Sequence, residues 1–238
     1  MISVILPARN EEQRLPHCLD ILQTWAADVI SPVEILVVCN GCTDNTEKIA
    51  NAYAKRNKRI RVLLSEPGKG VAVRTGMLAA LGYHRLFSDV DLSVSPDQWG
   101  PMIGKTDVMI ASREGRGSHR QDETWLRHLS GRAFNLATVM LLPELRGFQD
   151  TQCGLKVFSG LAAVDIFRRC TQRGWAFDIE ALYLAQRLGY SVQETPVIWI
   201  NDNRSHVRLW PDAWNMLRDV WQIRKHHVLN RDQTATTA

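Results

Sequence analysis

The sequence has no long hydrophobic run and no strong excess of charge. Its longest apolar stretch, residues 133–142, is about half of the ~20 residues that a membrane-spanning helix needs. The sequence therefore predicts no transmembrane helix, and any membrane contact is expected to be peripheral. Lys and Arg number 29 against 25 Asp and Glu, which is too small an excess to indicate a nucleic-acid-binding protein.

Cysteine is scarce as well. The five cysteines are an odd number and lie far apart, a pattern that favours reduced thiols over a disulfide framework. Cys39 and Cys42 have zinc-knuckle spacing, but no second Cys or His pair follows at a suitable interval, so a zinc site is not predicted. No signal peptide is recognised, and we expect a cytoplasmic protein that is peripheral on the cytoplasmic face of the membrane.

The first ninety residues alternate between β-type and helical periodicity. Strands are predicted at 2–8, 33–40, 59–66 and 84–91, and helices at 11–27, 43–56 and 68–82. Strands separated by such helices imply right-handed crossovers and a mostly parallel α/β sheet flanked by helices. Ligands of such sheets bind beyond the carboxyl ends of the strands.

The second half is less regular. Strands are predicted at 107–113, 154–160 and 191–200, a loop at 113–123, and helices at 125–142, 161–170, 177–189 and 210–227. The length of 238 residues suits one α/β domain. We predict a single domain over residues 1–229 and a disordered tail over 230–238.

Polar residues gather where the four early strands end. The ends carry PARNEE at 7–12, CNGCTD at 39–44, EPGKG at 66–70, and Asp89 with Asp91. On a parallel sheet all four clusters lie on one rim. They supply groups that can bond a base and ribose, a Gly-Lys-Gly turn that opens a helix, and paired carboxylates. A nucleotide diphosphate with its cation needs such parts.

Asp89 and Asp91 flank a single valine directly after an apolar run. If the segment is a strand end, the period of two points both carboxylates to the same side. Like charges that close raise each other's pKa unless a cation lies between them, so the pair predicts a divalent metal. The alternative is that Asp89 caps a turn and Asp91 is solvated.

Seven segments, taken in order, resemble family 2 glycosyltransferases with the GT-A fold. They are ILPARNEEQRLP, VVCNGCTDNT, PGKGVAVRTGM, FSDVDLS, ASR, DTQCGLKVF and WAFDIEALYLAQRLGYSVQETPVIW. Within that family the chain is most similar to the dolichyl-phosphate β-glucosyltransferases and related polyprenyl-phosphate glycosyltransferases. The resemblance extends from about residue 2 to residue 227.

The resemblance implies roles in donor binding. The positions where the family holds the base and ribose are Pro7, Ala8, Asn10, Glu11 and Asn40. Asn40 replaces a carboxylate, which leaves the choice between uridine and guanosine donors open. Lys69, in the Gly-Lys-Gly turn, would meet a phosphate, and Arg74 is either a second phosphate contact or a helix-surface charge.

The resemblance also implies the metal and its ligands. Asp89 and Asp91 match the family's DxD motif, whose carboxylates hold Mg²⁺ or Mn²⁺ against the donor diphosphate. Such a metal stabilises the charge that the nucleoside diphosphate leaving group acquires, without any proton transfer.

The acceptor is harder to assign. The family's lipid branch uses a polyprenyl phosphate, whose anionic oxygen needs positive charge rather than a strong base. One stretch of sequence carries Arg113, Arg116, Arg120, Arg127 and Arg132. These arginines could clamp a phosphate; the alternative is a solvated loop and helix face. Arg113 and Arg132 match family positions.

Asp150 and Asp178 match family positions too. If the acceptor were a sugar hydroxyl, one of them would remove its proton. If it is a phosphate, Asp150 and Gln152 would instead orient arginine or backbone groups near the donor sugar. Glu180 is either a helix-start charge or part of the site.

The last predicted helix is amphipathic. Its apolar face carries Trp210, Trp214, Leu217 and Trp221, and its basic residues are Arg218, Arg224 and Lys225. The face either packs on the core or contacts a bilayer.

Taken together, these features predict an inverting, metal-dependent hexosyltransferase that moves glucose from UDP-glucose to a polyprenyl (dolichyl-type) phosphate. Two alternatives stay open. The acceptor could be a sugar hydroxyl in polysaccharide or glycolipid assembly, or the chain could be a nucleotide-sugar-binding subunit without turnover.

Overall fold

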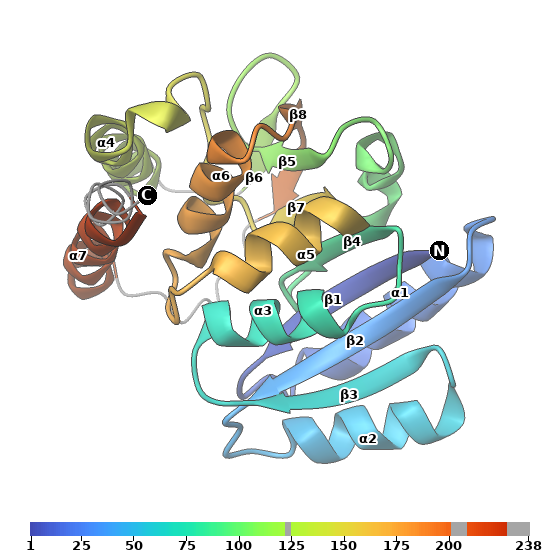
Figure 1. The fold of residues 1–238 in the computed structure, drawn as a ribbon. Helices are drawn as coiled ribbons and strands as arrows, with labels where there is room; N and C mark the ends of the chain where they lie inside the picture. Colours follow the sequence, from blue (N-terminus) through green and yellow to red (C-terminus); the bar gives the residue numbers. More distant parts are fainter. Residues whose placement is uncertain (122–124, 201–208, 228–238) are drawn as a thin grey trace, which may run out of the picture.

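The fold is built around a seven-stranded sheet in the order β3-β2-β1-β4-β7-β5-β8, in a computed structural model that describes residues 1–121, 125–200 and 209–227 (Figure 1). The strands are β1 (Ile2–Ala8), β2 (Val33–Asn40), β3 (Ile60–Ser65), β4 (His84–Ser88), β5 (Val108–Ser112), β7 (Leu155–Ser159) and β8 (Val192–Pro196). A second sheet pairs β6 (His119–Gln121) with β9 (Ile198–Ile200).

Helices cover both faces of the main sheet. They are α1 (Leu15–Asp28), α2 (Thr46–Arg56), α3 (Lys69–Ala79), α4 (Trp125–Leu141), α5 (Gly160–Arg169), α6 (Phe177–Arg187) and α7 (Leu209–His227), with 3₁₀ turns at Pro96–Gln98, Gly100–Met102 and Pro143–Leu145. One hydrophobic core lies between the sheet and α1 and α2, and the other lies between the sheet and α3, α5 and α6. Every residue of β1 and β2 is buried, as expected for strands covered on both faces.

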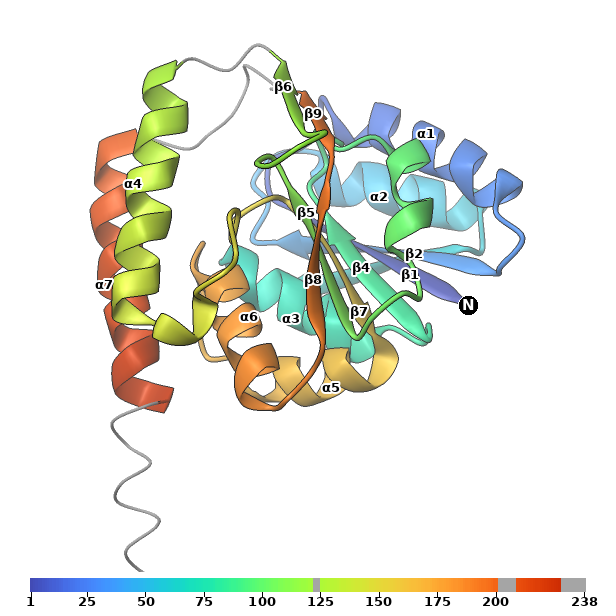
Figure 2. The ribbon, with the colours of Figure 1, turned by 90° about the horizontal axis from the view of Figure 1, so that it is seen from above.

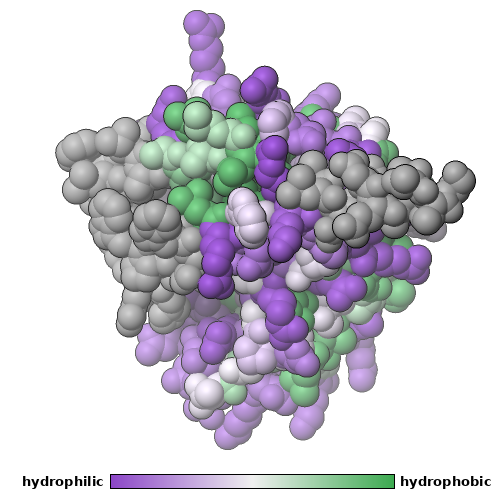
Figure 3. All heavy atoms as spheres, turned by 60° about the vertical axis from the view of Figure 1, so that its left-hand side comes forward, coloured by the Kyte–Doolittle hydropathy of each residue, from purple (hydrophilic) through white to green (hydrophobic). Residues whose placement is uncertain are grey.

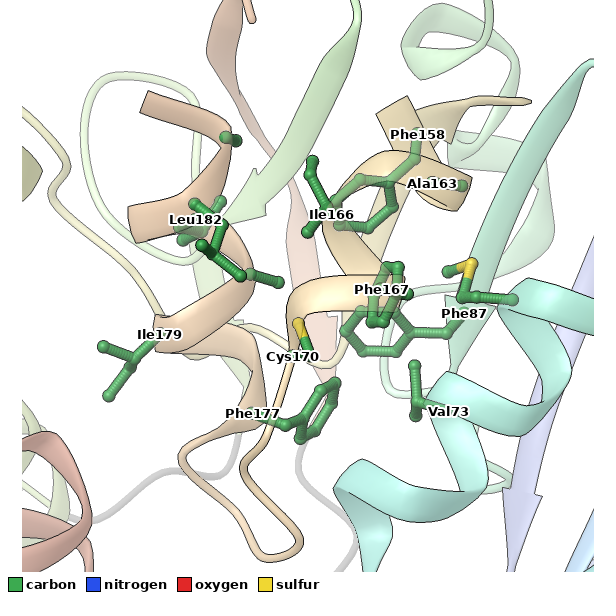
Figure 4. Close-up of a cluster of buried hydrophobic side chains, with 14 of the residues drawn as sticks. Val73, Phe87, Phe158, Ala163, Ile166, Phe167, Cys170, Phe177, Ile179 and Leu182 are labelled. Atoms are coloured by element: carbon green, nitrogen blue, oxygen red, sulfur yellow. The ribbon is translucent and has the colours of Figure 1, made fainter. Parts of the chain in front are cut away.

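Aromatic side chains fill the core beneath α3, α5 and α6 (Figure 4). Phe87 of β4 meets Phe177 of α6 edge to face with ring centres 5.3 Å apart, and Phe158 meets Phe167 in the same way at 5.2 Å. Phe87 is thus fixed two residues before Asp89, and Phe177 directly before Asp178. Aromatic packing therefore holds the two elements that lead into the carboxyl end of the sheet.

Helices α4 and α7 lie side by side, on the flank of the molecule away from α1 and α2 (Figure 2). Val220 and Ile223 of α7 are fully buried in the core, whereas the side chain of Trp221 is 50% exposed. Core packing, one of the two predicted alternatives for this helix, therefore holds for Val220 and Ile223, and contact with a bilayer stays a prediction. Trp210 and Trp214 lie outside the side chains that the structure describes. In the described ranges no helix combines the length and apolar character that crossing a membrane requires.

The mostly parallel sheet is confirmed, with four corrections to the predicted elements. The predicted loop at 113–123 contains the short strand β6. β4 ends at Ser88 rather than at residue 91, and the predicted strand 191–200 is two strands that belong to different sheets. β7 runs antiparallel to both β4 and β5. The predicted tail at 230–238 lies outside the described residues, and the single domain stays a prediction.

Gly76 lets α3 approach the sheet closely. A Cβ at this position would overlap Cγ2 of Ile5, a fully buried residue of β1, and would lie 3.1 Å from Cγ2 of Val38 on β2. The helix therefore packs on the sheet at a distance that only glycine permits.

We expect Gly76→Ala to lower the free energy of unfolding by about 1–3 kcal/mol, because the clash with Ile5 outweighs the ~1 kcal/mol that alanine adds in helix propensity. Urea unfolding measures the change. Gly131→Ala in α4 is the matched control, because among the described residues no atom outside the neighbouring turns of its own helix lies within 4 Å of a Cβ there; it should be neutral or stabilising. Equal effects of the two substitutions would contradict the packing argument.

Candidate active site

A cavity of about 790 Å³ opens at the carboxyl ends of β1, β2 and β4. Ten of the residues proposed from the sequence line it: Pro7, Asn10, Glu11, Asn40, Lys69, Asp89, Asp91, Asp150, Gln152 and Asp178. The cavity wall also carries three of the predicted arginines, Arg113, Arg120 and Arg132. Sequence positions from 7 to 178 thus meet in one site, as the rule for parallel sheets predicts.

Asp89 and Asp91 enter the cavity from a turn rather than from a strand. The amide of Leu92 donates to the carbonyl of Asp89 at 3.1 Å, and Leu92 has a φ of 50°. The amide of Ser93 donates to Oδ1 of Asp91 at 3.1 Å. The prediction that the period of a strand aligns the two carboxylates is therefore wrong in its mechanism, although both carboxylates do line the cavity.

Lys69 contacts the first of these carboxylates. Its Nζ lies 2.5 Å from Oδ1 of Asp89 and 4.8 Å from the ring centre of Trp175. Burial would lower the pKa of Lys69, but the charge of Asp89 outweighs it and raises the pKa. Lys69 therefore stays a cation beside the carboxylate pair.

The donor set fits a divalent cation that is shared with a substrate. Burial, and then repulsion from Asp89, raises the pKa of Asp91, so the pair is electrostatically strained and a cation would relieve it. Among the described residues no group of three or more His, Cys, Asp or Glu side chains could hold a metal by itself. Two carboxylates with the remaining ligands from phosphate oxygens and water are what Mg²⁺ commonly takes.

Gly154 packs directly against Asp89. A Cβ at residue 154 would overlap Oδ2 of Asp89. The DTQCG segment therefore lies against the back of the carboxylate pair, and any side chain at this position would displace Asp89.

Asn40 offers an unused acceptor to the cavity. The residue is 3% exposed, and its Oδ1 makes no hydrogen bond with any described residue. A buried polar atom without a partner costs stability, so this oxygen indicates a ligand that donates to it. Asn10, close by in the site, has a φ of 57° and its Oδ1 accepts from the amide of Thr43 at 2.8 Å.

Three predicted positions lie off the cavity. Ala8 is fully buried, and its carbonyl accepts from Sγ of Cys42. Arg74 donates from Nε to the carbonyl of Phe167 at 2.8 Å, which favours the helix-surface reading over a phosphate contact. Arg116 is exposed and does not line the cavity. The side chain of Arg127 lies outside those that the structure describes.

Arg113, which is partly buried, forms an ion pair with the buried Asp150. Nε and Nη2 of Arg113 donate to the carboxylate at 2.7 and 2.9 Å, and the Arg113 amide donates to it at 2.9 Å. The guanidinium also lies 5.5 Å from the ring centre of Trp199. Burial alone would raise the pKa of Asp150, but the charge and hydrogen bonds of Arg113 hold it well below the ordinary range.

Arg120 and Arg132, the other two predicted arginines that line the cavity, differ in how they are engaged. Nη2 of Arg120 lies 2.6 Å from Oε1 of Glu114. Arg132 is 65% exposed and meets the same Glu114 at 3.8 Å. Arg132 therefore has much the greater freedom to meet an incoming anion.

Sequence reasoning missed several contributors to the site. Lys156 is fully buried; its Nζ lies 3.3 Å from Oδ2 of Asp178 and 2.9 Å from the carbonyl of Cys153. Burial raises the pKa of Asp178, while Lys156 and Lys69 oppose that rise. A lysine inside the apolar run GLKVF was a signal for a buried partner. Trp175 and Trp199 gave no comparable signal.

The chain matches the family described as Glycosyl transferase family 2 over residues 3–160. It is 33% identical to the dolichyl-phosphate beta-glucosyltransferase of Drosophila melanogaster over 93% of this chain and 74% of the relative. The corresponding enzyme of Homo sapiens is 31% identical over 95% of this chain and 76% of its own length.

Solved structures show the same fold. Glucosyl-3-phosphoglycerate synthase from Mycobacterium tuberculosis, in complex with Mn²⁺, UDP-glucose and phosphoglyceric acid, superposes with a TM-score of 0.71 at 23% identity. The superposition covers 95% of this chain and 79% of that chain. The predicted GT-A-type α/β fold is thereby confirmed.

We expect Asp150→Asn to lower the free energy of unfolding by about 3 kcal/mol at pH 7, because it removes the charge of the buried carboxylate to which Arg113 donates three hydrogen bonds. The pKa of Asp150 is lower in the folded than in the unfolded protein, so its contribution is present above about pH 4 and is lost as the pH falls below that value. Denaturant unfolding from pH 7 to about pH 2 should therefore show a difference between wild type and variant that is constant above about pH 4 and shrinks steadily below it.

Glu66→Gln is the matched control, since the Glu66–Arg173 pair is largely exposed and should contribute less than about 1 kcal/mol. A cost for Asp150→Asn that is as small as the control's, or that does not change with pH, would contradict the assignment.

Proposed function

The chain belongs to glycosyl transferase family 2, and we propose that this glycosyltransferase moves glucose from UDP-glucose to a polyprenyl phosphate with inversion at the anomeric carbon. The observation that carries the proposal is the carboxylate pair Asp89–Asp91, which faces Lys69 in the same cavity as the unpartnered Oδ1 of Asn40. The glucosyl group and the lipid acceptor are those that the names of the relatives give.

The donor's base is assigned to Asn40. Its free Oδ1 accepts the N3–H of uracil, and its amide donates to a neighbouring carbonyl of the same ring. An amide is uncharged, so it recognises the base edge without adding to the negative charge of the cavity. Uridine is chosen over guanosine because the structural neighbour binds UDP-glucose.

The donor's diphosphate is assigned to Asp89, Asp91 and Lys69. The two carboxylates would hold Mg²⁺ or Mn²⁺; when bound, the ion neutralises charge on the diphosphate leaving group. Lys69 lies at the first position of α3, where its charge adds to the positive end of the helix. The lysine and the helix N-terminus together favour an anionic group at this place.

The acceptor is assigned to the arginine side of the cavity. A phosphate oxygen is already anionic near neutral pH and needs no base to attack the anomeric carbon. The one task left to the protein is to bring two anions together, and Arg132, at 65% exposed, has more freedom to do so than Arg113 or Arg120. Asp150 is a poor general base because Arg113 holds its pKa low.

A hydroxyl acceptor is the second candidate, and it rests on Asp178. This carboxylate lines the cavity, and its pKa is raised by burial, which suits proton removal near neutral pH. An essential ionisation that Asp178→Asn abolishes, with transfer to sugar hydroxyls, would favour it over the phosphate acceptor.

The membrane contact is assigned to the α4–α7 face, defined by Leu136, Met140 and Trp221. Their side chains are 62%, 73% and 50% exposed. Figure 3 shows apolar side chains gathered over the C-terminal part of α4, bordered by hydrophilic ones. Arg218 and Lys225, both exposed on α7, would meet anionic headgroups beside this apolar patch. A lipid acceptor requires such a contact.

The decisive assay incubates the enzyme with radiolabelled UDP-glucose, UDP-galactose or GDP-mannose, a polyprenyl phosphate and Mn²⁺ or Mg²⁺, and then extracts the lipid. We expect label from UDP-glucose in the organic phase, its loss with EDTA, and its loss in Asp91→Ala. Label only in water-soluble glycans would overturn the lipid acceptor, and transfer by Asp91→Ala at the wild-type rate would overturn the metal assignment.

Arg132→Gln should raise the KM for polyprenyl phosphate about tenfold or more, because one charge-assisted contact to phosphate is lost. Its affinity for UDP with Mn²⁺, measured by calorimetry, should stay within a factor of about two, since Arg132 is assigned to the acceptor side. Arg56→Gln, an exposed change on α2, is the charge-matched control. An unchanged acceptor KM in Arg132→Gln would remove this residue from the acceptor site.

A further inference from the structure

The loop at residues 171–176, which joins α5 to α6, supports the Gly-Lys-Gly turn from behind. The amide of Gly70 donates to the carbonyl of Arg173 at 3.0 Å. A Cβ at Gly68 would lie only 2.5 Å from that same carbonyl oxygen. Trp175 stands over Nζ of Lys69. The position of Lys69 therefore depends on the conformation of this loop, which lies beside the N-terminal end of α3 (Figure 1).

Glu180, in the first turn of α6, holds that loop. Its side chain is fully buried, and its carboxylate accepts from the Thr171 amide at 2.8 Å, the Thr171 hydroxyl at 2.7 Å and the Gln172 amide at 2.7 Å. The three donors belong to two consecutive loop residues. The carboxylate thus fixes the start of the loop on both of its oxygens.

The fourth partner of Glu180 comes from the C-terminal helix. Nε2 of His227, in the last turn of α7, lies 2.7 Å from Oε1 of Glu180. Because an ionised carboxylate only accepts, Nε2 of His227 donates. One buried carboxylate thereby joins α6, the 171–176 loop and α7.

Burial of a carboxylate costs free energy. If the side chain at position 180 only had to fill space in the core, an apolar residue would do so at lower cost. The partners of Glu180 explain why a carboxylate stands here. All four donors lie outside α6, and the loop that carries three of them touches the turn that presents Lys69. The network therefore fixes the 171–176 loop and, through it, Lys69. It does not serve to hold α6, the helix to which Glu180 belongs.

We propose that Glu180 is a positioning residue for the nucleoside diphosphate: together with His227 it holds the 171–176 loop so that Lys69 stays aimed at the donor diphosphate. The inference rests on the proposed function, because it assumes that the Gly-Lys-Gly turn meets that diphosphate. It adds that α7, the helix assigned to the membrane-facing side, also supports the donor site.

The test uses the full chain and titrates UDP, and GDP for comparison, in the presence of Mn²⁺ by calorimetry. Glu180→Gln turns one acceptor oxygen into an NH₂ group that faces donors, so UDP affinity should fall about tenfold or more. His227→Leu removes the donor from α7 and should lower UDP affinity in the same direction. His227→Gln keeps an N–H donor near Glu180 and should restore binding to near the wild-type value.

Steady-state kinetics separate positioning from loss of structure. In His227→Leu the KM for the donor should rise, while kcat at saturating donor and the KM for the acceptor change less than about twofold. A merely structural role would lower kcat and melting temperature together and would not be rescued by His227→Gln. The His227 pair decides the matter even if Glu180→Gln folds poorly.

Two outcomes would overturn the inference in distinguishable ways. If wild type binds UDP but His227→Leu and a folded Glu180→Gln bind it equally well, the positioning role is wrong and the proposed function stands. If wild type binds neither UDP nor GDP with Mn²⁺, the proposed function fails and the positioning role fails with it.

Discussion

The repulsion between Asp89 and Asp91 is the constraint on which the rest of the site depends. A turn after β4 places both carboxylates in one cavity, and there Lys69 contacts Asp89 while the pKa of Asp91 stays raised. The packing around the turn fixes both carboxylates in place despite their mutual repulsion. Phe87 packs against Phe177 just before the turn, and Gly154 packs directly against the carboxylate of Asp89. Two carboxylates held this close to each other attract a cation. Protein ligands of a nucleotide-bound metal ion need this property.

Much of the remaining charge in the cavity is already paired within the protein. Arg113 is engaged by Asp150, Arg120 by Glu114, and Lys156 by Asp178. The positive charge of the arginine-rich stretch is therefore partly neutralised by carboxylates. Its composition alone would indicate an excess of positive charge. Such pairs add little net stability but are costly to break, so they fix geometry. A substrate therefore meets a polar cavity wall whose geometry these ion pairs fix. Arg132 is more exposed than Arg113 and Arg120 and has more conformational freedom.

The sequence predicted the first half of the fold well, because β1 to β4 are apolar runs separated by helices and their carboxyl ends must meet on one edge. It failed where the outcome depends on tertiary partners. Nothing in LKVFS indicates that β7 runs antiparallel, and nothing in the run at 191–200 marks the break between β8 and β9. Family positions placed Asn40, Lys69 and Asp178 in the cavity correctly, whereas Arg74 bonds to α5 because a helix surface offers an arginine several partners at similar distance. Lys156 was overlooked because a strand pattern records apolar neighbours and does not reveal a buried counter-ion.

The family match ends at residue 160, and the elements that close the site lie beyond it. Trp175, Trp199 and Met216 line the cavity from beyond residue 160, and α7 then continues from Met216 to the end at which His227 meets Glu180. One helix therefore lines the cavity at Met216 and contacts Glu180 at its C-terminal end. Because Trp175, Trp199 and Met216 reach one cavity with Asn40 and Lys69, the shape of this cavity depends both on the part of the chain that the family model covers and on the part that follows it.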